Sequence, residues 1–302
     1  MTKVGWGRFA LVGFLWGTPY LFIKVAVEEI SPSTIIFFRV LIGASVLLPL
    51  ALMQKNISIP RKYWHIVLIY TVAELIGPWY LITNAEQKIS SGLAGLLVAT
   101  VPIWAAIFAS LTGDHTVWHK SRVFGLAIGF VGVVAVVGIE SISGRQDLKS
   151  IGMVILAAIG YAYAVNMINR KIPHVSGIAL NAWAMIITTI FYFPFAITHW
   201  PTQTPSVQAI ASVASLGVFC TAIAFILFFK LLAEVGPPRA SLITYLNTAV
   251  AVLLGVILLG EPLTLGILLG LPLVLIGSYF ASRKVRLQTL ALPIVLDLFA
   301  TL

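Results

Sequence analysis

The stretch Trp64–Asn84, WHIVLIYTVAELIGPWYLITN, is apolar over the length of a membrane helix and carries Glu74 near its centre. A carboxylate at bilayer depth costs at least about 2.5 kcal/mol on insertion scales, so such acids usually face a cavity or a partner. Gly77 and Pro78 follow, and the proline removes a backbone hydrogen bond just past the acid. The stretch therefore predicts a bent membrane helix that lines a polar pathway.

The composition of the whole chain supports this interpretation. Of its 302 residues, 60% are hydrophobic and 10% are charged, and the mean hydropathy is +1.02. A soluble domain of this size could not cover its surface with so few polar groups. The basic residues form no single patch, so we expect no nucleic-acid partner. Cys220 is the single cysteine, which excludes an intramolecular disulfide.

Ten apolar segments can be counted, each near the ~20 residues that a membrane helix needs. They cover residues 9–27, 33–53, 64–84, 90–111, 121–139, 151–169, 177–198, 207–232, 239–259 and 263–281. We therefore predict an all-α integral membrane protein with ten transmembrane helices. A polar connection, residues 141–150, divides it into a first repeat of five helices (1–140) and a second (151–283). Residues 284–302 form a tail to which we assign no role.

The basic residues predict the orientation. Lys24, Lys88, Arg145 and Lys149 fall on one side of the membrane and Arg39 lies within a span, while all other Lys and Arg residues fall on the opposite side. Because positive loops stay inside, both termini are expected in the cytoplasm of a multi-pass protein of the cell membrane.

The two halves also resemble each other. Trp16 corresponds to Tyr161, and Gly113-Asp114 after the fourth span corresponds to Gly260-Glu261 after the ninth. Five crossings are an odd number, so the second copy must enter the membrane from the opposite face. This predicts an inverted repeat, the arrangement that lets one fold open to either side in turn.

Several motifs resemble the EamA domain of the drug/metabolite transporter superfamily. They are Trp16-Gly17 and Lys24 in the first span, Ser31-Pro32, FFRVLIGA at 37–44, LLVATVPIWAAIF at 96–108 and LLGEPLT at 258–264. The resemblance covers about residues 5–283. It implies ten helices in two inverted repeats around a central cavity lined mainly by helices 1, 3, 4, 6, 8 and 9. It also implies transport of amino acids or other small metabolites or drugs, commonly outward. The second copy departs from the pattern, with Asn247-Thr248 in place of Pro102 and Ala184 in place of Arg39.

Three charged residues are the first candidates for a binding site. Counted at ~1.5 Å per residue, Glu74 lies ~15 Å from the cytoplasmic surface, Arg39 ~21 Å and Lys24 ~22 Å. Two cations and one acid at similar depth would suit a zwitterion or an anion. The alternative is a structural Arg39–Glu74 pair, with Lys24 extending to the outer surface.

Polar and aromatic residues extend the predicted substrate site. Their roles could equally be packing or placement at the membrane interface. The candidates are Trp16, Tyr80, Trp104, Tyr161, Tyr163, Asn166, Tyr245 and Asn247.

These features predict a secondary transporter that moves a small organic metabolite, such as an amino acid, by alternating access. We expect export, with proton coupling through Glu74. The alternatives are an ion-independent facilitator, a membrane-embedded enzyme and a channel. We expect no enzyme activity and no cofactor, since Walker A, HExxH and GxSxG motifs are absent.

Other partners follow from the same features. His115 and His119 lack a third ligand, so we expect no metal. The expected partners are the metabolite and the lipid bilayer, and small-residue motifs such as Gly125-xxx-Gly129 and Gly266-xxx-Gly270 allow helix packing or a homodimer.

Overall fold

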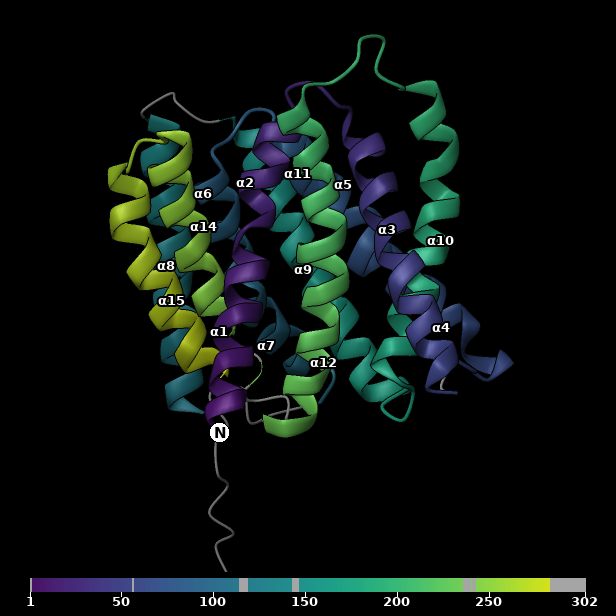
Figure 1. Ribbon diagram of the computed structural model, residues 1–302. Coiled ribbons are helices and arrows are strands. Elements are labelled where there is room, and N and C mark those ends of the chain that lie inside the picture. The colour runs from purple at the N-terminus through teal and green to yellow at the C-terminus, as the bar shows by residue number, and fades with distance from the viewer. Residues whose placement is uncertain are drawn as a thin grey trace, which may run out of the picture.

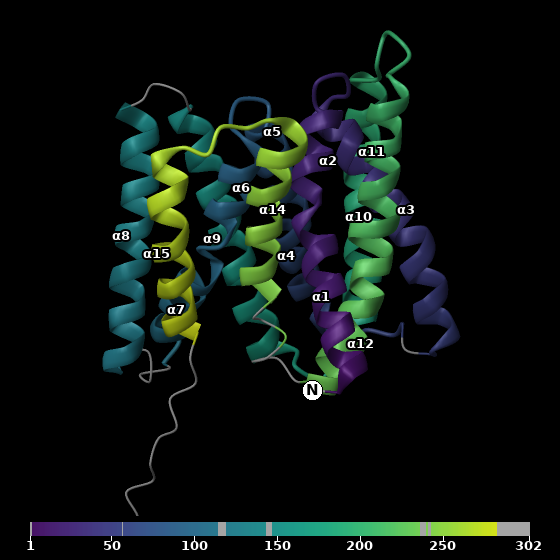
Figure 2. The same ribbon diagram turned by 60° about the vertical axis from the view of Figure 1, so that its left-hand side comes forward.

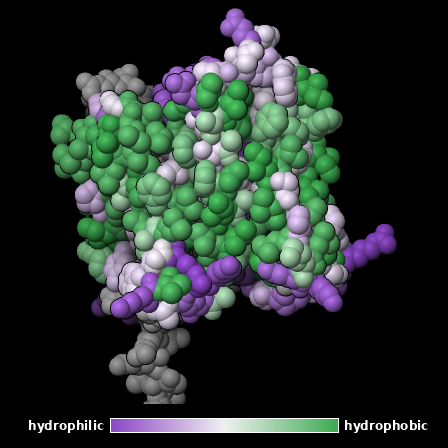
Figure 3. All heavy atoms as spheres, viewed as in Figure 1, coloured by the Kyte–Doolittle hydropathy of each residue, from purple (hydrophilic) through white to green (hydrophobic). Residues whose placement is uncertain are grey.

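The computed structural model describes residues 2–282 apart from 56, 114–118, 143–146, 236–239 and 241–242. Long helices stand side by side along one common direction (Figure 1). Figure 3 shows one face of this bundle, where a broad apolar band separates two more polar ends. Such a band is the surface that a multi-pass membrane protein presents to lipid. The tail at 284–302 and Asp114 lie outside the described residues.

In its described residues, the first half contains eight α-helices and two short turns of other helix types. Their bounds are α1 Lys3–Gly17, α2 Pro19–Ala26, α3 Pro32–Met53, η1 Arg61–Tyr63, α4 Trp64–Thr71, η2 Val72–Ile76, α5 Gly77–Ala85, α6 Ser91–Val98, α7 Val101–Leu111 and α8 Lys120–Ile142. The second half contains α9 Leu148–Lys171, α10 Gly177–Thr198, α11 Val207–Gly217, η4 Val218–Ile223, α12 Ala224–Val235, α14 Ile243–Leu259 and α15 Leu265–Ser282.

Seven helical stretches in the described part of the chain are long and apolar enough to cross a membrane. They are Lys3–Ala26, Pro32–Met53, Arg61–Ala85, Ser91–Leu111, Leu148–Lys171, Gly177–Thr198 and Val207–Val235. The helices α8, α14 and α15 pack beside them. The protein is thus an all-helical, multi-pass membrane protein, while the count of ten spans and the inverted orientation of the halves stay predictions.

Two spans of the first half are broken at prolines. The first span breaks between α1 and α2, where Pro19 supplies no N–H and the Thr18 hydroxyl donates to the Leu15 carbonyl at 3.0 Å. The fourth span breaks between α6 and α7 just before Pro102. The corresponding helix of the second half, α14, has no proline and is continuous. Broken helices expose backbone groups, which is tolerated in a membrane only inside the protein.

Two further spans each contain a π-helical turn. The Gly77 N–H bonds to the Val72 carbonyl, five residues back, and the Ala224 N–H likewise bonds to the Phe219 carbonyl. After the first turn, Pro78 has no N–H with which to donate a backbone hydrogen bond, and this favours the wider hydrogen-bonded ring of a π-helix. The predicted bend near Glu74 is thus a π-helical turn, and a matching turn lies in the second half without a proline.

Helices of one half pack mainly against helices of the other. The helix α3 packs along α10, and α8 packs along α15. A Cβ on Gly277 of α15 would collide with the backbone of Gly129 and would lie 2.7 Å from the Gly125 carbonyl oxygen. Glycines therefore let α8 and α15 approach closely within one subunit.

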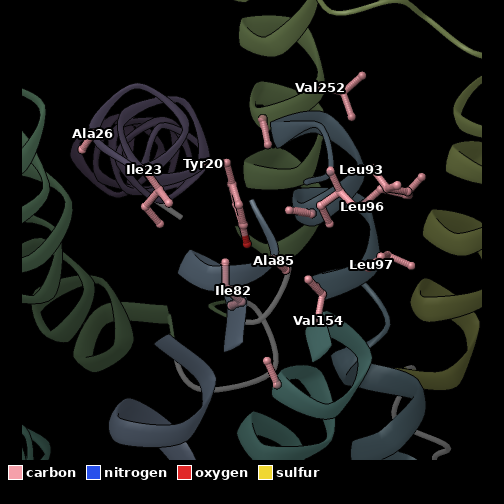
Figure 4. Packing of buried hydrophobic residues seen from close by; sticks show 14 of the residues in the cluster. Tyr20, Ile23, Ala26, Ile82, Ala85, Leu93, Leu96, Leu97, Val154 and Val252 are labelled. Carbon is pink, nitrogen blue, oxygen red and sulfur yellow. The ribbon is translucent and has the colours of Figure 1, made fainter. Parts of the chain in front are cut away.

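The buried side chains form two large clusters, and Tyr161 of α9 packs against both. Figure 4 shows part of the first cluster, where the Tyr20 ring reaches from α2 toward Ile82 and Ala85 of α5. The polar residues described below are embedded between these apolar layers.

Candidate functional site

Glu74 lies in the π-helical turn Val72–Ile76. Its Oε2 atom is buried and has no hydrogen-bond partner. The turn itself is held from α10, because the Tyr192 hydroxyl donates to the Ile76 carbonyl at 2.8 Å. A buried carboxyl oxygen without a donor is costly, so such a group is expected at a site where a proton or a ligand binds.

Two tyrosines lie within electrostatic range of Glu74. Electrostatic interactions connect it to Tyr70 of α4 and to Tyr161 of α9. The Tyr70 hydroxyl donates to Asn181 Oδ1 at 3.2 Å. The acid therefore interacts electrostatically with polar side chains from both halves of the chain, as is expected of a residue that lines a pathway.

Arg39 of α3 is 9% exposed. Its Nε donates to Thr221 Oγ1 at 3.1 Å, and its guanidinium carbon lies 3.7 Å from the centre of the Trp79 ring. The Trp79 side chain also interacts with Tyr161. The cation thus reaches the π-helical turn of the second half and is stabilised by an aromatic face.

The structural Arg39–Glu74 pair considered from the sequence is wrong. Among the described residues the one ion pair is that of Arg8 Nη1 with Glu234 Oε2, at 3.1 Å. The depth estimate gave only the positions of Arg39 and Glu74 along their helices. It could not give the rotation of each helix, which brings Arg39 to Thr221 instead.

Lys24 does not pair with Glu74 either. Its ammonium donates to the backbone carbonyls of Glu86, at 2.7 Å, and of Ile89, at 2.9 Å. The gathering of Lys24, Arg39 and Glu74 into one charged site is therefore not observed. Lys24 instead holds the chain between α5 and α6.

Glu86 is the acid that the sequence reasoning missed. Its side chain is 0% exposed, and neither carboxyl oxygen has a hydrogen-bond partner. It follows the last residue of α5 directly, between the apolar segments 64–84 and 90–111 that the sequence predicts. The available signal was that two acids, not one, lie close to an apolar span.

Of the aromatic candidates, Tyr161 joins the polar cluster and others pack elsewhere. Trp16 lies against the rings of Phe225 and Phe228, at centroid distances of 5.7 and 4.6 Å. The Trp104 indole donates to Thr100 Oγ1 at 3.2 Å. Tyr80 is 41% exposed on the outside of the bundle.

The second half contributes a separate cleft and a helix contact. The cleft measures about 260 Å³ and is lined by Tyr163, Asn166, Met167, Arg170 and Lys171 of α9. On α14, Tyr245 lies against Tyr279, with ring centres 6.3 Å apart, and Asn247 Oδ1 accepts from the Thr248 hydroxyl at 3.3 Å.

Six of these residues are named the central polar cluster below: Arg39, Tyr70, Glu74, Trp79, Tyr161 and Thr221. They join α3, α4, η2, α5, α9 and η4, and so connect both halves. In the described residues no three His, Cys, Asp or Glu side chains converge as metal ligands would, and His115 lies outside the described part. An acid, a cation and aromatic rings can together hold a small zwitterion or amphiphile.

Comparison with known proteins identifies the class. The model of the EamA-like transporter family matches residues 5–138 and again 148–283. The chain belongs to this family and consists of two copies of its domain, which confirms the resemblance seen in the sequence.

Proteins that match this chain along nearly its whole length are named as transporters. The uncharacterized transporter YoaV of Bacillus subtilis (strain 168) is 27% identical, covering 94% of this chain and 100% of its own. An uncharacterized transporter of Archaeoglobus fulgidus is 26% identical, covering 92% and 99%. The uncharacterized inner membrane transporter YedA of Escherichia coli (strain K12) is 27% identical, covering 91% and 92%. A crystal structure matches with a TM-score of 0.66 at 17% identity, covering 94% of this chain and 100% of the other, and supports the fold.

Proposed function

We propose that this EamA-family transporter is a secondary transporter that exports a small zwitterionic or amphiphilic metabolite, an amino acid or similar, across the cytoplasmic membrane. Protons would drive it through Glu74. The observation that carries this proposal is the unpartnered, buried Oε2 of Glu74 within a π-helical turn that faces both halves. An ionisable group in this position marks a transport pathway by default.

The other members of the central polar cluster support this substrate class. Within the part of the chain that the structure describes, the Arg39 guanidinium has one hydrogen bond, to Thr221, and its planar face lies on Trp79. Its remaining N–H groups suit the carboxylate of a zwitterion. Tyr161 and Trp79 offer aromatic faces to an amine or an apolar side chain.

Exchange of substrate for protons would follow from competition between the two at one site. When the site faces the side with more protons, Glu74 takes up a proton; in the other orientation it releases that proton as substrate binds. The π-helical turn has fewer well-formed hydrogen bonds than a regular helix, so it is the natural place for the span to change its bend.

The test is transport by purified protein in liposomes, with a panel of labelled amino acids. Glu74→Gln keeps the shape and hydrogen bonding of the protonated acid. It should abolish accumulation driven by a pH difference while sparing counterflow of substrate. Cys220→Ser, in the matching turn of the second half, is the control and should keep both activities.

The outcomes separate the candidate functions. If Glu74→Gln still accumulates substrate under a pH difference, proton coupling through this residue is refuted and the ion-independent facilitator is favoured. Saturable counterflow excludes a channel. Chemical change of the substrate would reveal a membrane-embedded enzyme.

A further inference from the structure

The segment 86–92, which is the connection between α5 and α6 with the first two residues of α6, is held by charged groups at both of its ends. It lies with the α14–α15 connection at the end of the bundle opposite the N-terminus (Figure 2). The Lys24 ammonium binds the carbonyl oxygens of Glu86 and Ile89, at 2.7 and 2.9 Å. Glu86 caps the C-terminal end of α5 and Ile89 lies in the connection, so the cation stabilises carbonyl oxygens at the negative end of this helix and just beyond it.

Glu261, from the second half, binds the other end of the connection. Its carboxylate accepts from the Ser91 N–H at 2.7 Å, the Ser91 hydroxyl at 2.9 Å and the Gly92 N–H at 3.0 Å. These groups begin the helix α6, where an anion is favoured. Gly260, with φ +64°, turns the chain so that Glu261 returns to this position.

Space for Glu261 comes from a glycine on the preceding helix. A Cβ on Gly255 would collide with Glu261 Oε2, so the carboxylate fits against α14 only where a side chain is missing. Lys24, residues 86–92 and Glu261 are together named the latch. The latch joins the two halves at one end of the molecule.

The Glu86 side chain lies inside the latch without a partner. It is 0% exposed and both its oxygens lack hydrogen bonds. The groups that face it are Lys24 of α2, Arg39 of α3 and Glu261, together with the Tyr20 hydroxyl of α2. Lys24 binds the backbone of Glu86 and forms no ion pair with its carboxyl group, since the one ion pair among described residues lies elsewhere.

We propose that Glu86 is a proton-binding site that controls the latch. In the neutral form its carboxyl group tolerates burial, and Lys24 remains on the two carbonyls. When the proton leaves to solvent at this end, the buried carboxylate draws the Lys24 ammonium to itself. The carbonyls of Glu86 and Ile89 then lose their cation, and residues 86–92 separate from the bundle.

This inference adds a second acid to the proposed transport cycle but needs neither a known substrate nor coupling through Glu74. Glu86 lies a little over three helical turns beyond Glu74 on the same span. The latch would thus open one end of the molecule in response to a proton bound at that end. Both steps of alternating access would then be sensitive to protons at separate positions.

A cysteine reporter tests the proposal in detergent, where topology and transport do not matter. Ala85 is 0% exposed at the end of α5, so Ala85→Cys, in a Cys220→Ser background, reports whether the latch is open. Its reaction with a polar maleimide is measured between about pH 6 and about pH 9, where a buried carboxyl group can ionise. Gln203→Cys, on an exposed connection, corrects for ionisation of the thiol itself.

Four variants give the decisive comparison. Relative to Gln203→Cys, labelling at Ala85→Cys should rise about tenfold or more with pH as the latch opens. Glu86→Gln, which mimics the neutral acid, should keep the thiol protected at every pH. Glu28→Gln makes the same change at an exposed acid and should behave as the parent. Lys24→Met should leave the thiol reactive at every pH.

The proposal fails on three results. A parent protein whose Ala85→Cys thiol is unreactive at all pH values has no such opening. A Glu86→Gln variant with unchanged pH dependence places the proton elsewhere. A Lys24→Met variant that stays protected shows that Lys24 does not hold the connection. None of these results depends on Glu74, so a failure here leaves the proposed transport function standing.

Discussion

The π-helical turn of the first half, Val72–Ile76, carries Glu74, whereas the turn of the second half, Val218–Ile223, carries Cys220 and Thr221. The backbone hydrogen bonds of the two turns match. Their side chains do not: Glu74 has an unpartnered oxygen, while the Thr221 hydroxyl donates to the Leu216 carbonyl at 2.8 Å and accepts from Arg39. The duplicated fold thus keeps a widened turn in both halves and places an acid in one.

The groups that support each turn also differ. Tyr192 of α10 donates to the first turn, and Arg39 of α3 donates to the second. Each turn is therefore held by a helix of the opposite half. The neutral hydroxyl of Tyr192 holds the turn that contains Glu74, and the cation Arg39 holds the turn that contains no acid. The following changes test that difference.

The largest effect is expected for Arg39→Ala. Removing this long, buried side chain leaves a cavity beside Trp79 and should lower the free energy of unfolding by about 2–5 kcal/mol. A double-mutant cycle with Thr221→Val should give a coupling energy of about 1.5–3 kcal/mol, as for a hydrogen bond to a charged group. Unfolding in detergent, followed by circular dichroism, measures both.

The same cycle with Glu74→Gln is the control for Arg39. Since Arg39 and Glu74 form no ion pair, their effects should add to within about 0.5 kcal/mol. A coupling as large as that with Thr221 would show that Arg39 serves the first turn after all.

Substitutions in the two π-helical turns are expected to change the free energy of unfolding in opposite directions. Glu74→Met removes a carboxyl group with a buried, unpartnered oxygen and should raise the free energy of unfolding by about 1 kcal/mol at neutral pH. Thr221→Val removes a hydroxyl with two partners and should lower it by about 1–3 kcal/mol. Thermal unfolding of both variants in one detergent gives the comparison. Destabilisation by Glu74→Met would reveal a partner for Glu74 and weaken the transport proposal.

Tyr192→Phe should have a smaller effect. It removes the hydrogen bond to Ile76 but keeps the ring, so the expected loss is about 1 kcal/mol. Because the bond holds the first turn, counterflow of substrate should change more than stability does. Tyr63→Phe, in the short turn η1 at the beginning of the same span, is the matched control, and equal effects of the two would remove Tyr192 from the mechanism.

The smallest effect concerns Glu29, which connects the two halves in a surface contact. Hydrogen bonds from the Ser206 hydroxyl and the Ser206 N–H hold the pKa of Glu29 below its ordinary value of 4.5. A lowered pKa in the folded state adds stability above 4.5 that is lost as pH falls through the folded value. Glu29→Gln should therefore flatten the acid side of the thermal stability profile, whereas Glu28→Gln should not. Identical acid profiles of the two variants would show that the contact contributes nothing.

The membrane class, the apolar spans and the doubled family domain could be predicted from the sequence, because hydropathy and spacing are local properties of the chain. The bend near Glu74 was also predictable, since Pro78 lacks the N–H that a regular helix requires. The matching turn at Val218–Ile223 was not, because no proline marks it. Of the candidate residues, Tyr161 interacts electrostatically with both Glu74 and Arg39, while the role of all three in binding substrate stays a prediction.

The partners of those residues were decided by tertiary structure alone. Depth along a helix follows from residue number, but which neighbour a side chain meets depends on helix rotation and crossing. This is why Arg39 contacts Thr221 and Trp79 rather than Glu74, and why Lys24 binds the carbonyls of Glu86 and Ile89. Glu86 looked like a loop residue in the sequence and became a buried, unpartnered acid only when α2, α3 and the α14–α15 connection packed around it.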